Sequence, residues 1–173
     1  MPRPRRDDEP GCLFHVMNRG LARRPVFESE DDVRLFLSLV ARAVHRDLVH
    51  LVAYSVLTNH FHLLVRSVAA TLSTAMHDIL GTYVQYFNRT RTRDGPLFKG
   101  RFTSVPIRSD RQFFYTVRYI DANPVDAGIV ANAEDYVHGS MRAHVGLVRR
   151  PRWLEATTID RNMAGALQRG MPR

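Results

Sequence analysis

Two histidines two residues apart are the clearest candidates for chemistry in this sequence. His60 and His62 lie in the segment 58–65, where Phe61 and Leu63 alternate with them. Successive side chains of a β-strand point to opposite faces, so both imidazoles share one face and the apolar side chains share the other. Two imidazoles on one face can bind a divalent cation, together with a third ligand from elsewhere in the fold. The same spacing also occurs on ordinary polar strand faces, so both interpretations stay open.

A second candidate group precedes Pro124. Tyr119 and Asn123 are four residues apart and therefore share one face of the helix that we expect there. A tyrosine hydroxyl can attack phosphorus, and an amide oxygen can contribute to the ligand set of a cation. Each residue also fits a structural role, Tyr119 as part of an amphipathic core and Asn123 as the end of the helix.

The charge of the chain points to a polyanionic partner. Its 173 residues carry 25 Lys and Arg against 17 Asp and Glu, a formal net charge of +8, and Lys99 is the single lysine. Arginine suits phosphates and guanine edges, so this composition favours nucleic acid, although a merely basic surface would look the same. We expect phosphate contacts from Arg91, Arg93, Lys99 and Arg101, and base stacking by Phe98 and Phe102. The alternative for the two phenylalanines is burial in the core.

The hydrophobic pattern predicts alternating strands and helices. Strands are expected at residues 12–17, 50–57, 60–66 and 102–107, with Thr58 and Asn59 as a hairpin turn. Helices are expected from Ser29 to about His45, at 72–88, and from Asp110 to Asn123, where Pro124 stops the last one. A short helix is expected around residues 134–144. The order βαββαβα indicates an α+β fold of ferredoxin-like, split βαβ type: an antiparallel sheet with helices on one face and an appended C-terminal helix that carries Tyr119.

The chain divides into one domain and two basic ends. We expect a flexible arm at residues 1–10 with Arg3, Arg5 and Arg6, a domain at 11–145, and an Arg-rich, partly disordered tail at 146–173. No apolar run is long enough for a membrane span and no secretory signal is recognisable, so a cytoplasmic protein without a membrane partner is expected. Cys12 is the only cysteine, which excludes an internal disulfide and a zinc site built from several thiolates.

Five segments together resemble the single-tyrosine HUH transposase family, and within it the REP-associated tyrosine transposases. They are HVMNRG at 15–20, TNHFHLLV at 58–65, QYFNR at 85–89, GPLFKGRF at 95–102 and RYIDANPVDAG at 118–128. The resemblance spans roughly residues 12–140. Mobile insertion-sequence relatives usually have Gln where this chain has Asn123, which argues against an autonomous insertion sequence.

The resemblance implies a specific chemistry. Tyr119 would be the nucleophile, His60, His62 and Asn123 the ligands of Mg²⁺ or Mn²⁺, and the product a 5′-phosphotyrosine on single-stranded DNA that carries REP-type hairpins. It also implies a bacterial protein associated with the nucleoid, a monomer or homodimer, whose basic arm helps to recognise a short sequence at the foot of the hairpin.

A second function class remains open from the sequence. Ferredoxin-like sheets also bind single-stranded nucleic acid without chemistry, through aromatic side chains on the open face. A non-catalytic or regulatory nucleic-acid-binding protein is therefore the alternative. The middle strands distinguish the two classes, because this chain has His60 and His62 where an RNA-binding sheet would display Phe or Tyr.

Overall fold

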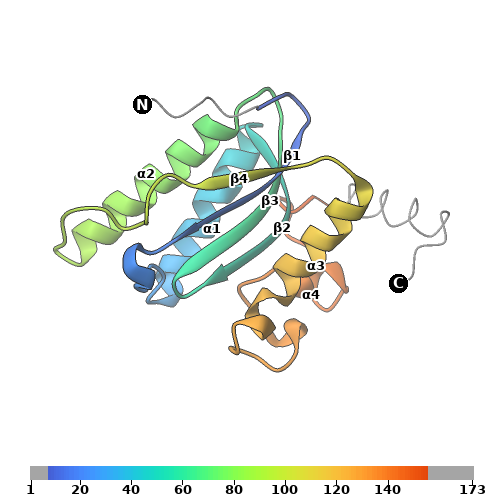
Figure 1. Ribbon diagram of the computed structural model, residues 1–173. Helices are drawn as coiled ribbons and strands as arrows, with labels where there is room; N and C mark the ends of the chain where they lie inside the picture. The colour runs from blue at the N-terminus through green and yellow to red at the C-terminus, as the bar shows by residue number, and fades with distance from the viewer. Residues whose placement is uncertain (1–7, 156–173) are drawn as a thin grey trace.

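The computed structural model describes residues 8–155, and its centre is a four-stranded antiparallel sheet (Figure 1). The strand order is β2-β3-β1-β4. The strands are β1 (Leu13–Arg19), β2 (Val49–Leu57), β3 (His60–Ser67) and β4 (Thr103–Ile107). This order, with one helix between β1 and β2 and another between β3 and β4, confirms the expected α+β, split βαβ arrangement.

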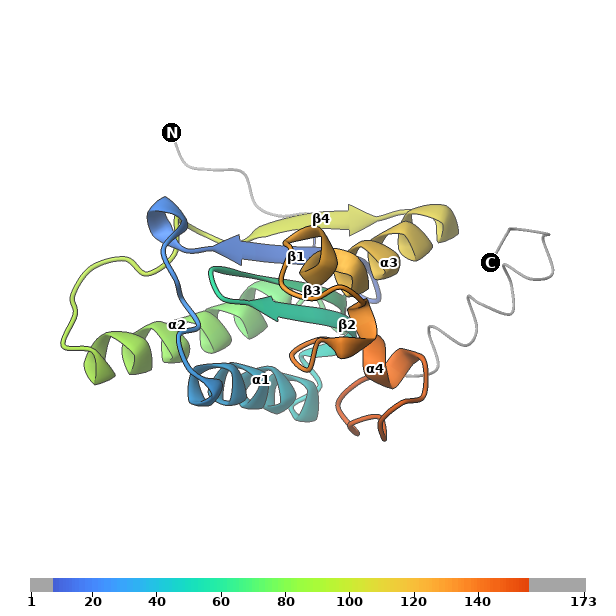
Figure 2. The ribbon, with the colours of Figure 1, turned by 90° about the horizontal axis from the view of Figure 1, so that it is seen from below.

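Helices α1 (Glu30–His45) and α2 (Leu72–Thr90) cover the same face of the sheet (Figure 2). The start of α1 is a capping box, in which the Ser29 hydroxyl accepts from the Asp32 amide while the Asp32 carboxylate accepts from the Ser29 amide. Between the helices and the sheet lies the main core, where the Phe36 ring contacts both Phe61 of β3 and Tyr83 of α2. The apolar partners of the two histidines therefore point into this core.

Helix α3 (Asp110–Asp126) packs on the other face, against β2 and β3. Phe113 and Ile120 of α3 form a second, smaller core with Ala53 and Leu64. The expectation that Pro124 ends this helix was wrong, because α3 continues to Asp126 with Pro124 inside it. The proline lies in the last turn, where it forfeits one main-chain hydrogen bond, and it is buried.

The segment after α3 runs along the outer edge of β2. A 3-10 turn (Ala133–Asp135) and a short helix α4 (Met141–His144) replace the single short helix expected there. The Val56 amide donates to His138 O and the Glu155 amide to Leu51 O, so both ends of this segment pair with β2. The contact of Glu155 with β2 lies ten residues beyond position 145, where the domain was expected to end. No helix among residues 8–155 combines the length and apolar character of a transmembrane span.

Candidate active site

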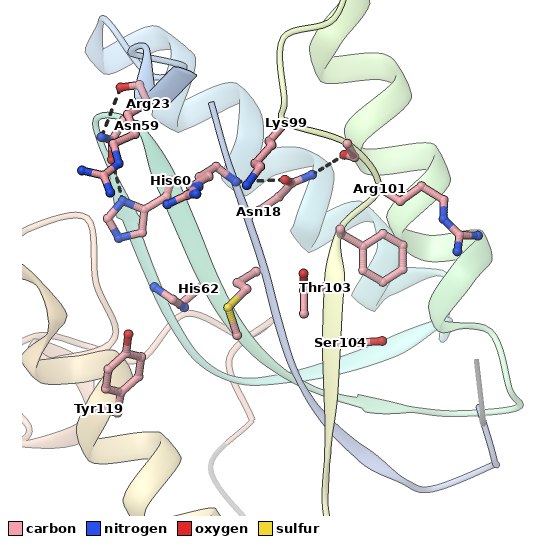
Figure 3. A pocket seen from close by; sticks show the side chains of 14 residues that line it. Asn18, Arg23, Asn59, His60, His62, Lys99, Arg101, Thr103, Ser104 and Tyr119 are labelled. Carbon is pink, nitrogen blue, oxygen red and sulfur yellow. Dashed lines mark hydrogen bonds between the residues drawn. The ribbon is translucent and has the colours of Figure 1, made fainter. Parts of the chain in front are cut away.

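The open part of the α3 face contains a cavity of about 930 Å³ (Figure 3). Among its lining residues are His60, His62 and Tyr119, which come from two segments far apart in the sequence. Figure 3 shows the Tyr119 hydroxyl directed toward the two imidazoles. The structure therefore brings the predicted nucleophile and two of its predicted metal ligands to one place.

His60 contacts the third predicted ligand directly. Its Nε2 lies 3.0 Å from Asn123 Oδ1, and its Nδ1 lies 2.6 Å from Asn59 Oδ1. Burial lowers the pKa of His60, and the bond to Asn123 opposes this effect only in part. A lowered pKa leaves the imidazole neutral near pH 7, which is the form that binds a cation.

His62 lies between a second histidine and the tyrosine. Its Nδ1 is 2.9 Å from Nε2 of His15, and its ring centroid is 5.1 Å from that of His60 and 5.4 Å from that of Tyr119. Burial lowers the pKa of His62 to about 3, helped by repulsion from His15 and His60, and burial alone lowers the pKa of His15 to about 4. Tyr119 is 37% exposed, so its ring is reachable from the cavity.

Sheet register explains how β1 and β3 gather these rings. Arg19 pairs with His60, Met17 with His62 and His15 with Leu64. Paired residues on neighbouring strands share a face of the sheet. His15 therefore lies on the same face as His62, two residues along β1 from Met17, the residue that pairs with His62.

The hairpin turn before His60 is fixed by the loop that follows β1. The Val26 and Phe27 amides both donate to Thr58 O, and the Gly20 amide donates to Asn59 O. A Cβ on Gly20 would lie 2.1 Å from Arg24 O, so only glycine fits this close approach. These bonds hold the end of β3 that presents His60.

A buried polar network holds α3 against β2. The Ser140 hydroxyl lies 2.7 Å from Asp121 Oδ1, and His144 Nδ1 lies 2.7 Å from Asp121 Oδ2. His144 Nε2 lies 3.1 Å from Val52 O on β2. Because Asp121 is two residues from both Tyr119 and Asn123, this network, which we call the α3 anchor, sets the position of both side chains.

Cationic side chains form one rim of the cavity. Lys99 and Arg101, both predicted DNA contacts, are exposed there, and so is Arg19. The Lys99 amide donates to Arg19 O, and Asn18 Nδ2 donates to Gly100 O, so β1 holds the loop in place. Arg23 also lines the cavity. This rim suits the phosphates of a nucleic-acid strand.

Arg91, a predicted phosphate contact, does not line the cavity, and its guanidinium is engaged in ion pairs. Its guanidinium pairs with Glu28, at 2.8 Å, and with the fully buried Asp32, and it lies 3.9 Å from the centroid of the Phe87 ring. Arg91 therefore joins the end of α2 to the start of α1. Arg93 also lies near Phe87, at 5.7 Å, rather than along the cavity, and its contact with DNA stays a prediction.

The two phenylalanines proposed to stack on bases belong to the core. Phe98 is 6% exposed and packs against the rings of Phe61 and Tyr83. Phe102 borders the cavity but is 9% exposed, which leaves too little of its ring face for a base. The alternative weighed for them, burial, is what the structure shows.

The amino-terminal arm lies mostly outside the described residues, and so do Arg3, Arg5 and Arg6. Of its last residues, Asp8 has a structural role, because Oδ2 of Asp8 accepts from the Leu72 amide at the start of α2. A carboxylate at a helix amino terminus stabilises the helix.

The predicted ligand set fits a hard divalent cation. His60 and His62 would supply imidazole nitrogens and Asn123 an amide oxygen, which are atom types that bind divalent cations, and Asn123 Oδ1 lies 3.0 Å from His60 Nε2. Within residues 8–155 no group of three or more His, Cys, Asp or Glu side chains is arranged as a metal site. A cation at this cavity would therefore take two imidazoles and the Asn123 amide.

Sequence reasoning missed several residues of the site. His15 lies in the apolar run at 12–17, which we interpreted only as a buried strand, and Arg19, Arg23 and Asn18 follow it. Their roles depend on the pairing of β1 with β3, which local patterns do not specify. Two signals could have pointed to His15, Asn18 and Arg19: the alternation that places His15 in phase with Arg19, and the segment HVMNRG at 15–20, which is part of the resemblance.

Comparison with known proteins agrees with this fold. The family model described as "Transposase IS200 like" matches residues 9–123. The chain belongs to this family of DNA-processing transposases. No curated protein matches the chain.

The solved structures that match this chain include the following two. One is a REP-associated tyrosine transposase bound to a REP hairpin, with a TM-score of 0.67 and 21% identity, covering 90% of this chain and 92% of that chain. The other is a candidate transposase from Deinococcus radiodurans, with a TM-score of 0.47 and 14% identity, covering 69% of this chain and 96% of that chain. The first likeness establishes that the two chains share a fold.

Proposed function

We propose that this transposase is a metal-dependent single-stranded DNA endonuclease and strand transferase that forms a 5′-phosphotyrosine through Tyr119. The observation that carries the proposal is the meeting of Tyr119, His62 and His60 at one cationic cavity, with Asn123 bonded to His60. Nothing in the packing of the main core requires these polar groups on the opposite face of the sheet.

In the proposed reaction, Tyr119 Oη attacks the scissile phosphorus. The new bond joins phosphorus to the tyrosine oxygen, and the bond to the 3′-oxygen of the preceding nucleotide breaks. The tyrosine proton is lost, and the leaving oxygen gains a proton and becomes a 3′-hydroxyl. A second 3′-hydroxyl can reverse the step and join a new strand, so no nucleotide cofactor is needed.

Three side chains would hold the cofactor, Mg²⁺ or Mn²⁺: His60, His62 and Asn123. Such a cation, when bound, polarises the phosphate and stabilises the charge that develops on its oxygens. The lowered pKa values of His60 and His62 favour the neutral imidazole, which has one ring nitrogen with a free lone pair, at pH 7.

The cationic rim would bind the DNA strand. Lys99, Arg101 and Arg19 can contact phosphates on either side of the scissile bond. We further propose that the substrate carries a REP-type hairpin, as in the structurally similar transposase that was solved with such a hairpin.

The test is a covalent adduct. We expect the protein, incubated with labelled single-stranded hairpin oligonucleotides and Mn²⁺ or Mg²⁺, to give a protein–DNA band on a denaturing gel. Tyr119→Phe should abolish the band but leave hairpin binding nearly unchanged, because only the hydroxyl is removed.

Tyr86→Phe and Tyr115→Phe are the matched controls. Tyr115 lies four residues before Tyr119 on the same helix and is 72% exposed. Its hydroxyl is therefore an accessible alternative nucleophile. An adduct that persists in Tyr119→Phe, or that disappears only in Tyr115→Phe, would contradict the proposed nucleophile.

The alternative, a non-catalytic nucleic-acid-binding sheet, has less support. The described parts of the middle strands β1 and β3 present His15, Met17, His60 and His62 on the α3 face, without the Phe or Tyr rings that such sheets use. Hairpin binding without any adduct in the assay above would favour this alternative.

A further inference from the structure

His15 is a buried polar side chain that the proposed reaction does not use. It lies on β1 with 9% of its surface exposed and is not among the residues that line the cavity. Its Nε2 is 2.9 Å from His62 Nδ1, and its ring centroid lies 5.0 Å from that of His62 and 5.8 Å from that of Tyr119. The buried imidazole of His15 therefore contacts both the predicted metal ligand His62 and the predicted nucleophile Tyr119.

We propose that His15 is a positioning residue, which holds His62 in the tautomer that has its hydrogen on Nδ1 and so leaves Nε2 bare toward the cavity. The inference rests on the proposed function, because a bare Nε2 is useful only if His62 binds a cation. It concerns the contact between two side chains of this chain, which can also be measured without any cation.

The hydrogen bond between the two rings permits two arrangements. If His15 Nε2 carries the hydrogen, it donates to His62 Nδ1, and a neutral His62 then carries its own hydrogen on Nε2, where it cannot bind a cation. If His62 Nδ1 carries the hydrogen, it donates to His15 Nε2, and His62 Nε2 has a free lone pair. Only the second arrangement fits the proposed role of His62.

This contact resembles a general device of metal sites. A histidine ligand almost always donates its second ring N–H to a fixed acceptor, which sets both the tautomer and the ring orientation. The partner here is an imidazole, held in place by the pairing of β1 with β3 and by a T-shaped contact with the Tyr119 ring. His15 therefore couples the orientation of His62 to the position of Tyr119.

Two substitutions of His15 distinguish the effect of its hydrogen-bond acceptor from the effect of the space that its ring fills. His15→Phe keeps a planar ring but removes the acceptor at the Nε2 position. His15→Gln keeps an acceptor, because its side-chain oxygen can reach the position of the imidazole Nε2. Both variants are first compared with the wild type by thermal unfolding, so that a loss of fold is recognised.

The first measurement uses the metal-free protein. Nitrogen-15 NMR of the imidazole rings distinguishes a protonated from a bare ring nitrogen. We expect His62 to carry its hydrogen on Nδ1 in the wild type and in His15→Gln, and to shift toward Nε2–H in His15→Phe. His62 with its hydrogen on Nε2 in the wild type, or a tautomer unchanged in His15→Phe, would overturn the inference.

The second measurement is a calorimetric titration with Mn²⁺. We expect His15→Phe to weaken Mn²⁺ binding about 10- to 100-fold and His15→Gln to stay within about threefold of the wild type. Equal binding by the wild type and a folded His15→Phe would also overturn the inference. A wild type that binds no Mn²⁺ and forms no adduct would instead refute the proposed function, and the tautomer measurement keeps that result distinct.

Discussion

His60, His62 and Asn123 offer ligand atoms of unequal strength. Two are imidazole nitrogens, and the third is the neutral amide oxygen that already contacts His60 Nε2. An imidazole binds a divalent cation more strongly than a neutral amide, and water can replace an amide oxygen. Substitutions at the three positions should therefore differ in their effect.

Removing either histidine should abolish adduct formation. A bound cation stabilises the transition state by several kcal/mol, so we expect His60→Ala and His62→Ala each to reduce the adduct yield at least about 100-fold. Asn123→Ala should reduce it only about tenfold, and added Mn²⁺ should restore part of the loss. The measurement is the initial rate of adduct formation against Mn²⁺ concentration, and cleavage by the wild type in excess EDTA would refute the metal role.

At the residue scale the sequence predicted which candidate residues lie together better than it predicted their surroundings. Strand alternation placed His60 and His62 on one face, and helical spacing placed Tyr119 near Asn123, because both patterns are local. His15 was missed and Phe98 was misplaced, because their environments depend on which strands pair and which loops close over the core. Those are long-range properties that a single local pattern does not contain.

Some of the helices, strands and loops near the cavity present side chains to it, and others hold neighbouring elements together. The boundaries of most helices and strands lie within about two residues of those expected from capping and periodicity. The cationic residues that follow α2 look alike in the sequence, but the structure gives them different surroundings. Arg91 joins α1 to α2, whereas Arg101 is exposed at the cavity.

Arg91 and Arg101 should therefore respond in opposite ways to the same substitution. Arg91→Gln leaves the Asp32 carboxylate buried without its cation. It should lower the free energy of unfolding by about 3 kcal/mol, the low end for a broken buried pair, because Asp32 keeps its bonds to the Glu28 and Ser29 amides. Its effect on DNA affinity should be small.

Arg101→Gln should leave stability nearly unchanged but weaken binding to all single strands alike and reduce the salt slope by about one. Denaturant unfolding and DNA titrations at two salt concentrations measure both effects. Weakened DNA binding by a fully stable Arg91→Gln would restore the original assignment of Arg91.

Across the whole molecule, the sheet separates a face that carries the main core from a face that carries the candidate site. Helices α1 and α2 lie on one side of the sheet and α3 on the other (Figures 1 and 2). The large aromatic core lies on the side of α1 and α2, and the cavity with its cationic rim lies on the side of α3. Asp8 ties the end of the amino-terminal arm to the start of α2. An experiment on the arm must therefore leave Asp8 in place.

The arm should contribute to the choice of target. We expect replacement of Arg3, Arg5 and Arg6 by Gln to weaken binding to a cognate hairpin about tenfold, and binding to a scrambled strand of equal length much less, because arginine can read guanine edges. The comparison is made at two salt concentrations. Equal losses for both DNAs would show that these arginines act only as nonspecific charge.

The α3 anchor has a consequence for how many molecules one cleavage needs. Asp121, Ser140 and His144 fasten the tyrosine helix to β2 of the same chain, and the Tyr119 ring lies 5.4 Å from that chain's own His62. Under the proposed assignment, each polypeptide carries all of the proposed reacting groups, and we expect no exchange of a helix between copies. A mixture of the Tyr119→Phe and His62→Ala variants should accordingly form no adduct. Neither variant can supply the other with the missing side chain, because each tyrosine helix stays with its own chain. Adduct recovered in the mixture would mean that the anchor releases and that two chains share their sites.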